Sequence, residues 1–446
     1  MSKKRSLFIT ALILAVPSIL QNLVTNLSQM VDNLMVGPLQ EHAIAGVTIT
    51  NQIFFIFTIV LFGIGGTAGI FMPQFRSIGN EQKVAETFRV SLGFSIATGI
   101  LFFSLLYFIP DVIFRLFAND PPTLENAHLY LRYILPTFLI FPISLAIGNA
   151  FRFTGYIRLP LYVSIITVTS NIFLNYSLIY GHFGFPAMGV QGAALGTMLA
   201  RIIELAVFVS LTMLIKSPIK LNFAKLFDFE KTLLIHFVKK GYGLVLNELF
   251  WSMGMQTIVI IYTQRISSNI AALSIAQALG NMIFIGMGGM SVAFSIILGE
   301  HLGLERFKEA KHDAKKLLKM AAVMGLSLGI SVFLLSLVLI QFYDVAPEIT
   351  ATAQRLILIN ASFSWLYYLN ASFYFILRSG GDTRSVLFID SGFTWVVVIP
   401  ISFLLGSLGL ALVFHFFLVQ ILEFLKLGVA VKMYNKGTWL NNLTQI

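Results

Sequence analysis

Long apolar runs separated by short polar gaps make up almost the whole of the sequence. The runs reach or exceed about 20 residues, the length that an α-helix needs to cross a bilayer. They show no apolar–polar alternation with a period of two, so membrane strands are not indicated. We therefore predict an all-α membrane protein with twelve transmembrane helices. These lie near residues 7–36, 44–72, 87–117, 128–150, 159–181, 189–215, 241–263, 270–299, 317–343, 349–377, 385–405 and 407–434.

The composition agrees with a polytopic membrane protein. Of 446 residues, 57% are hydrophobic and only 11% are charged, whereas soluble proteins carry about 25% charged residues. The absence of cysteine excludes disulfides, thiol catalysis and Cys-based metal sites. The first apolar run is too long for a signal peptide and contains an acid, so we interpret it as a retained first span.

Lysine and arginine are distributed unequally between the two sets of connections. One set, with both termini, carries 25 of them and the opposite set carries 4. By the positive-inside rule both termini are expected to be cytoplasmic. The net charge of +10 therefore reflects topology, and no nucleic-acid partner is expected.

An internal repeat divides the spans into two sets of six. The pattern R-x2-G-x2-R occurs at 152–158 and again at 378–384, an offset of 226 residues, each time between the fourth and fifth spans of its half. Six spans per repeat give both halves the same orientation, and we expect two parallel bundles around a central cleft. The predicted domains are 1–215 and 241–446, joined by a basic, amphipathic cytoplasmic linker at 216–240. The arginines of the two loops are expected to anchor helix ends at lipid headgroups.

The strongest candidate for chemistry is Asp32, near the outer end of the first span. An acid in an apolar span costs about 2.5–3.5 kcal/mol on insertion scales and is functional by default. A carboxylate removed from water between helices can bind and release a proton near neutral pH. With Asn22, Asn26, Asn33 and Asn175, the same site could instead offer oxygen ligands to Na⁺, which is the candidate metal ion of this sequence.

Other ionisable residues within spans have simpler interpretations. Arg201 with Glu204, and Glu423 with Lys426, are three residues apart on predicted helices and are expected to pair locally. Asp390 lies about one turn into the eleventh span, and we expect it to pair with a polar group of the other half if it is functional.

Several polar and aromatic residues could line the cleft and hold a substrate. Cation–π contact with a hydrophobic cation is the chemistry that such aromatic residues offer, although ordinary packing is the better explanation for any single one. Pro17 removes one helical hydrogen bond and could bend the first span. The candidate cleft residues are Asn22, Asn26, Trp251, Tyr262, Gln277, Trp365 and Asn370.

Four segments resemble the multidrug and toxic compound extrusion (MATE) family of secondary transporters. They contain VDNLMVG at 31–37 with AIAG at 43–46, NIFLNYSLIYG at 171–181, the segment 271–303, and LRSGGDT at 377–383. The resemblance implies antiport, in which an inward proton or Na⁺ drives export of small amphiphilic, often cationic, compounds. It implies no cofactor and no enzymatic reaction, and we expect a monomer in contact with membrane lipid.

The resemblance also assigns roles to single residues. Asp32 matches the first-span acid of the family, Asn175 stands where the DinF-like branch has an aspartate, and Glu248 matches a seventh-span acid of the NorM-like branch. Two alternatives remain open at this stage. They are a lipid-linked saccharide flippase of the same superfamily, which tends to carry basic residues in its cavity, and a membrane receptor that transports nothing.

Overall fold

The computed structural model describes residues 6–39, 41–221, 223–265, 270–343 and 345–445, and within these ranges it contains helices and no strand. The chain divides into two compact units, which are described here one at a time. Unit 2 comprises Leu20–Gly241, and unit 1 combines Met1–Ile19 with Tyr242–Ile446. The boundaries fall inside two long helices, α1 (Leu7–Val36) and α9 (Lys231–Arg265), so each of these contributes to both units.

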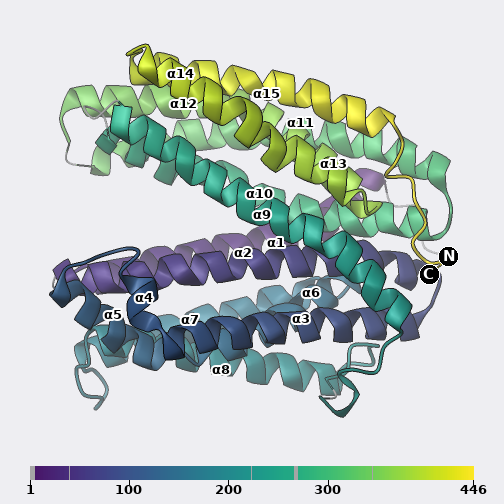
Figure 1. Cartoon of the computed structure of the whole chain (residues 1–446), viewed down its shortest axis with the longest axis horizontal. Helices are drawn as coiled ribbons and strands as arrows, with labels where there is room; N and C mark the ends of the chain where they lie inside the picture. Colours follow the sequence, from purple (N-terminus) through teal and green to yellow (C-terminus); the bar gives the residue numbers. More distant parts are fainter. Residues whose placement is uncertain (1–5, 40, 222, 266–269, 344, 446) are drawn as a thin grey trace. The chain divides into compact units, whose positions relative to one another are not determined.

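The remaining helices follow in chain order (Figure 1). Unit 2 contains α2 (Glu41–Ser77), α3 (Glu81–Phe108), α4 (Pro110–Phe114), α5 (Pro121–Ile134), α6 (Thr137–Phe153), α7 (Arg158–Tyr180), α8 (Val190–Leu214) and the short η1 (Phe223–Lys225). Unit 1 contains α10 (Ile270–Gly303), α11 (Phe307–Leu339), η3 (Ile340–Phe342), α12 (Pro347–Ser379), α13 (Thr383–Leu387), η4 (Phe388–Gly392), η5 (Thr394–Val398), α14 (Ile399–Ser407) and α15 (Leu412–Asn435).

The described helices account for the twelve predicted spans. Ten are long and apolar enough to cross a membrane, and the pair α5–α6, bent by 52°, counts as one more. The twelfth is α12, which has 33 residues. Its asparagine, serine and tyrosine residues make it less apolar than the others. The prediction of an all-α membrane protein is confirmed.

Some predicted spans are interrupted in the structure. The span predicted at 87–117 is broken at Ile109, because Pro110 begins the separate short helix α4. The span predicted at 385–405 contains two π-helical segments, η4 and η5, between α13 and α14. The linker predicted at 216–240 ends earlier than expected, since its last part, from Lys231, is already the beginning of α9.

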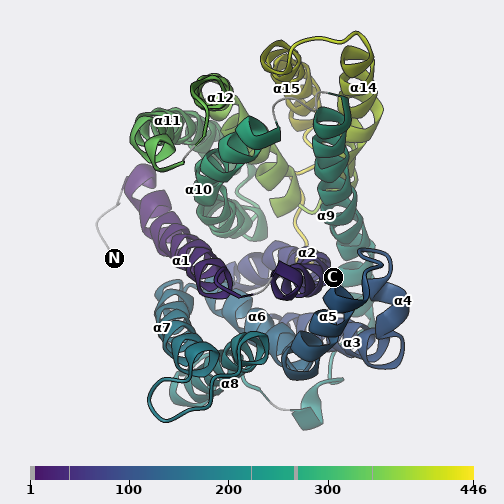
Figure 2. The ribbon, with the colours of Figure 1, turned by 90° about the vertical axis from the view of Figure 1, so that its left-hand side faces the viewer.

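In unit 2, neighbouring helices approach closely at glycine residues, which have no side chain to keep them apart. Helix α7 packs along α8, and α2 packs against α3, α5 and α6 (Figure 2). On α8, Gly192 faces the backbone of Leu178 on α7 so closely that a methyl group there would overlap it. This is the close contact expected of small residues four apart in membrane helices.

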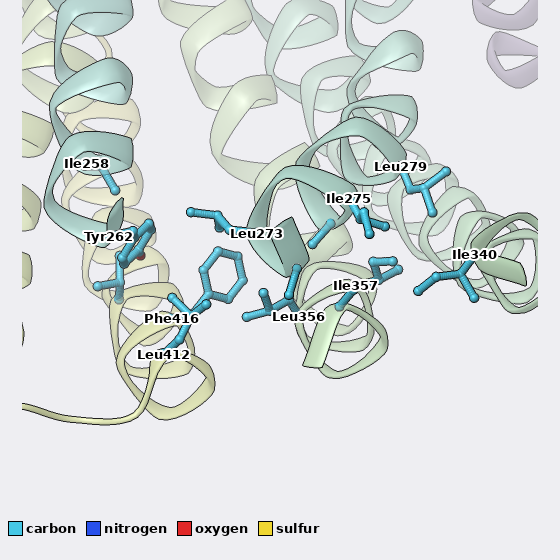
Figure 3. Packing of buried hydrophobic residues seen from close by; sticks show 14 of the residues in the cluster. Ile258, Tyr262, Leu273, Ile275, Leu279, Ile340, Leu356, Ile357, Leu412 and Phe416 are labelled. Atoms are coloured by element: carbon cyan, nitrogen blue, oxygen red, sulfur yellow. The ribbon is translucent and has the colours of Figure 1, made fainter. Parts of the chain in front are cut away.

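In unit 1, α12 packs against α10, α11 and α15. A cluster of buried apolar side chains lies between these elements and α9 (Figure 3). Tyr262 belongs to this cluster with 3% of its surface exposed, and its ring contacts those of His415 and Phe416 at centroid distances of 5.0 and 5.8 Å. The cluster forms the core of this part of the unit.

Candidate functional site

Asp32 lies in a hydrogen-bonded polar group inside unit 2. Its Oδ1 accepts a hydrogen bond of 2.9 Å from Nδ2 of Asn175 on α7. Asp32 itself is half-buried, whereas Asn175 is only 2% exposed. An amide that donates to a carboxylate stabilises its ionised form. The structure therefore brings together the two residues that sequence reasoning placed on different spans.

Neutral side chains extend this group to a third helix. Asn171 lies one turn before Asn175 on α7, and its Oδ1 accepts from Ser28 Oγ on α1 at 3.5 Å. Its Nδ2 donates to Thr197 Oγ1 on α8 at 3.3 Å. Asn175 Nδ2 also lies 3.5 Å from Asn171 Oδ1, so these side chains form one hydrogen-bonded group with Asp32. Their hydroxyl and amide oxygens are the ligand types that a hard cation such as Na⁺ accepts.

One oxygen of this group has no partner within the described residues. It is Oδ1 of Asn175, which is buried and forms no hydrogen bond. Gly196 on α8 lies directly against this oxygen, and a Cβ atom at that position would overlap it. A buried acceptor without a donor is costly, so it marks a place where a proton or cation would be stabilised.

The other candidates on α1 are more exposed than Asp32. Asn26 and Asn33 are exposed and Asn22 is half-buried. The amide of Asn26 donates to the backbone oxygen of Asn22 at 2.9 Å, a bond within one helix. Hydrogen bonds of the described residues link Asp32 to α7 and not to these three amides.

Arg201 and Glu204 on α8 form the expected local pair, with NH1 to Oε2 at 2.7 Å. The guanidinium also stacks on the ring of Phe141, 4.6 Å from its centre. The Arg201 side chain is 24% exposed. The guanidinium of Arg201 thus forms an ion pair with Glu204 and a cation–π contact with Phe141, both within unit 2.

Glu248 lies in unit 1, where it accepts a hydrogen bond of 2.9 Å from the hydroxyl of Tyr374 on α12. The guanidinium of Arg378 stacks 5.5 Å from the centre of the same tyrosine ring. Asn370, on the same helix, donates to Glu423 on α15 at 2.7 Å. One side of α12 therefore carries polar residues that are bonded to α9 and α15.

Two expectations about charged partners in this unit were wrong. Lys426 bonds Asp390 Oδ1 at 2.8 Å rather than Glu423, although Glu423 is closer in the sequence. Asp390 was expected to pair across the halves, yet both its partners, Lys426 and Asn247, belong to its own unit. A tertiary partner in a buried site outweighs the small gain of about 0.2–0.5 kcal/mol from a local helical pair.

The arginines of the repeated loops were expected at the lipid headgroups. This was wrong for Arg152 and Arg378, whereas Arg158 and Arg384 are exposed and the expectation for them stays a prediction. Arg152 donates to Asn149 of its own helix and to Gln21 Oε1 on α1 at 2.8 Å. Arg378 is 7% exposed and donates to Ser291 on α10 at 2.7 Å. Both guanidinium groups therefore bond neighbouring helices inside their own units.

The residues proposed for a cleft have varied surroundings. Trp251 is 38% exposed, Gln277 is half-buried, and the ring of Trp365 contacts that of Phe424 at 6.0 Å. Asn370 is 4% exposed and bonds Glu423, and Tyr262 belongs to the apolar cluster of Figure 3. No bond within the described residues joins these side chains into one site.

Sequence reasoning missed Ser28, Asn171 and Thr197. The signal that could have found them is periodicity: Ser28 precedes Asp32 by four residues, and Asn171 precedes Asn175 by four. Residues four apart share a helix face, so polar pairs on two spans can meet as two layers. Thr197 carries no such signal, because no residue one helical turn away from it also bonds this polar group.

A family model described as MatE matches residues 17–177 and 244–404, one match in each half. The chain is 26% identical over 408 residues to a "Probable multidrug resistance protein NorM" of Thermotoga maritima, covering 89% of this chain and 86% of that protein. It is 23% identical to a "Probable multidrug resistance protein YoeA" of Bacillus subtilis, covering 88% and 85%.

Solved structures share the fold across nearly the whole length. One, described as the "Crystal structure of MATE in the bent conformation", has a TM-score of 0.83 at 17% identity and covers 98% of this chain and 100% of that chain. Another, an "Outward-facing conformation of a multidrug resistance MATE family transporter of the MOP superfamily", has a TM-score of 0.84 at 16% identity, with 98% and 96% covered.

Proposed function

The chain belongs to the MatE family of membrane transporters, and we propose that it is a secondary active antiporter that exports amphiphilic organic cations in exchange for a proton bound at Asp32. Two relatives are named as probable multidrug resistance proteins, which supports an organic substrate. The proposal includes a bacterial inner-membrane location, with both termini on the cytoplasmic side, as the charge distribution indicates.

The observation that carries the proposal is the bond between Asp32 and Asn175 beside an unpartnered oxygen. In the ionised state, Asp32 accepts a hydrogen bond from Asn175 Nδ2 at 2.9 Å. In the protonated state, the carboxyl group needs an acceptor for its own O–H. A rotation of the Asn175 amide would present Oδ1 to Asp32 and satisfy the oxygen that is unpartnered now. One asparagine can therefore stabilise both protonation states in turn.

The proton and the substrate then compete for one negative charge. With Asp32 ionised, unit 2 holds a carboxylate that attracts an organic cation, and protonation removes that attraction. Binding of one ligand lowers the affinity for the other by the same factor, as thermodynamic linkage requires. This competition is what couples export of the cation to entry of the proton.

Na⁺ is the alternative coupling ion. The oxygens of Ser28, Asn171, Asn175 and Thr197, added to the carboxylate of Asp32, have the chemistry of its ligands. We favour the proton because it needs a single acceptor, which Asn175 Oδ1 would supply after rotation, whereas Oδ1 of Asn171, one of the oxygens that Na⁺ would need, already accepts from Ser28. The experiment below separates the two ions.

Pro17 is proposed to let α1 bend during the cycle. It lies inside α1, two residues before Ile19, where the contact pattern of the helix changes from unit 1 to unit 2. Its ring removes one backbone hydrogen bond of the helix, which lowers the cost of bending at that point.

The flippase alternative receives no support from Arg201. A site for a lipid phosphate needs an available cation, and the guanidinium of Arg201 already bonds Glu204 and stacks on Phe141. Transport of any solute by the purified protein in vesicles would exclude the receptor alternative.

The test is ethidium efflux from right-side-out membrane vesicles, with a pH gradient and a Na⁺ gradient imposed separately. We expect efflux driven by the pH gradient, abolished by Asp32→Asn and retained in Asp228→Asn, the same substitution at an exposed loop position. Efflux that follows the Na⁺ gradient would assign Na⁺ as the coupling ion. Efflux unchanged by Asp32→Asn would contradict the role of this carboxylate, and no efflux of any cationic dye would contradict the multidrug proposal.

A further inference from the structure

We propose that Asp390 and Asn247 form a monovalent-cation site in unit 1 that is filled by the ammonium group of Lys426. The chain would thus carry its own tethered cation at this carboxylate, where a free ion would otherwise bind. The proposal concerns a different unit from Asp32 and goes beyond the antiport proposed above, because it assigns a ligand class to a site with no role so far.

Both oxygens of the Asp390 carboxyl group accept hydrogen bonds. Oδ1 accepts from Lys426 Nζ at 2.8 Å and Oδ2 accepts from Asn247 Nδ2 at 3.2 Å. A protonated carboxyl group would need to donate one bond, so this arrangement suits the ionised form. The Asp390 side chain is 19% exposed and that of Lys426 is 13% exposed. Both charged side chains are thus mostly enclosed by the protein.

The amide of Asn247 is held in this orientation by Ser391. Its Oδ1 accepts from the backbone N–H of Ser391 at 3.3 Å and from Ser391 Oγ at 2.9 Å. With the oxygen engaged on that side, the NH₂ group is directed to Asp390. Asn247 is therefore a positioning residue that keeps the carboxylate oriented toward Lys426.

The backbone that presents Asp390 is irregular. Asp390 lies in η4, a π-helical segment, and its carbonyl oxygen accepts from Thr394 Oγ1 at 2.8 Å. Single π-helical turns inside α-helices occur frequently at functional sites, because the wider turn re-aims a side chain. Here the turn places the carboxylate against α15, which carries Lys426.

The repeat shows what unit 2 has at the same place. Gln21 and Ser164 are 143 residues apart and bond at 2.8 Å, and Asn247 and Asp390 are also 143 apart. The two pairs are related by the offset of 226 residues that relates the repeated arginine loops. In unit 2 the guanidinium of Arg152 also donates to Gln21 Oε1 at 2.8 Å, so each pair bonds a basic side chain, but of the two pairs only Asn247–Asp390 contains a carboxylate.

The two carboxylates also differ in their cations. Among the ion pairs of the described residues, Asp390 is paired with Lys426 and none includes Asp32. Arg201 on α8, a basic residue of the same unit, is bonded to Glu204 of its own helix. Asp32 is therefore open to a free ion, whereas Asp390 is already neutralised.

Other charged groups around Lys426 do not replace Asp390 as its partner. The carboxylate of Glu423, three residues before Lys426, accepts the amide of Asn370 at 2.7 Å. The carboxylate of Glu248, next to Asn247 on α9, accepts from Tyr374 at 2.9 Å. Removal of the ammonium group would leave Asp390 as a carboxylate without its bonded cation, in a partly desolvated site, and this would favour uptake of Na⁺.

The test measures Na⁺ binding directly, without transport. The purified full-length protein carries Asp32→Asn in every sample, so that Na⁺ at that carboxylate cannot contribute. The midpoint of thermal unfolding is measured in NaCl and in choline chloride at equal ionic strength. We expect Lys426→Met to gain a saturable rise of the midpoint with Na⁺, since a ligand that binds only the folded state stabilises it.

The matched controls define the site. Lys432→Met removes the same charge at an exposed position of α15, and we expect no response to Na⁺. The parent protein should also show none, and adding Asp390→Asn to Lys426→Met should abolish the response. A folded Lys426→Met protein that ignores Na⁺, or a parent protein whose Na⁺ response requires Asp390, would overturn the proposal.

A second variant tests the proposal independently, in case Lys426→Met does not fold. The chain has no cysteine, so Lys426→Cys introduces a unique thiol. Aminoethyl methanethiosulfonate attaches an ammonium group to this thiol, and methyl methanethiosulfonate attaches a neutral methyl group through the same disulfide linkage. We expect the Na⁺ response to disappear only with the ammonium reagent. The same response after both reagents would contradict a tethered cation.

Discussion

Replacing Gly196 by alanine should disturb Asp32 without touching it. A Cβ at this position would overlap Oδ1 of Asn175 and would lie 3.1 Å from its backbone nitrogen and 3.3 Å from its Cα. These backbone atoms belong to α7 and cannot move aside alone, so the amide must turn away. The hydrogen bond of 2.9 Å from its Nδ2 to Asp32 is then lost.

The size of the effect follows from the charge on the acceptor. A hydrogen bond to a charged group contributes about 1.5–3 kcal/mol, and about 1.4 kcal/mol corresponds to one pH unit in a titration. Because the lost N–H stabilised the ionised carboxylate, proton release by Gly196→Ala should require a higher pH. We expect the pH profile of dye efflux in vesicles to move upward by about one to two units.

The matched control is Gly93→Ala on α3, where no atom lies within 4 Å of the new Cβ. It should leave the pH profile unchanged and, as a helical Gly→Ala change, stabilise the fold slightly. A Gly196→Ala protein that folds and keeps the parental pH profile would refute the proposed link between Asn175 and Asp32.

Two further substitutions test packing and charge. Gly289→Ala would place a Cβ against the backbone oxygen of Ala15 and should lower the free energy of unfolding by about 1–3 kcal/mol. Its control, Gly428→Ala, has open space around the new Cβ and should not lower the midpoint of thermal unfolding. Equal midpoints for the two variants would contradict the close helix contact at Gly289. Lys83→Met removes the cation 3.0 Å from Glu86, whose side chain is 4% exposed, and should cost about 3 kcal/mol, measured by denaturant unfolding. An unchanged unfolding curve would show that Glu86 needs no cation.

The number and type of the elements could be predicted because membrane length constrains apolar runs so strongly. The first span was placed at 7–36, the bounds that the structure gives to α1. Breaks were harder to locate. Pro110 signals one, whereas the π-helical segments η4 and η5 contain no proline, and Pro400 follows η5 by two residues in α14.

Partners across helices were the least predictable part of the site. Asp32 stood out because a lone acid in an apolar run is expensive. Its neighbours Asn171 and Thr197 are neutral and cost less to bury, so only the spacing of Asn171 from Asn175 marked the first and nothing in the sequence marked the second. Spacing favoured Glu423 as the partner of Lys426, yet which side of a helix faces which neighbour depends on packing that the sequence does not show directly.

The most direct test of the central claim is proton release when an organic cation binds. Purified protein in weakly buffered detergent solution is mixed with ethidium, and the pH is followed with an indicator dye. If Asp32 carries a proton that competes with the substrate, binding should release protons near neutral pH, and Asp32→Asn should abolish this release while Asp228→Asn retains it. Proton release of the same size from Asp32→Asn would contradict the account.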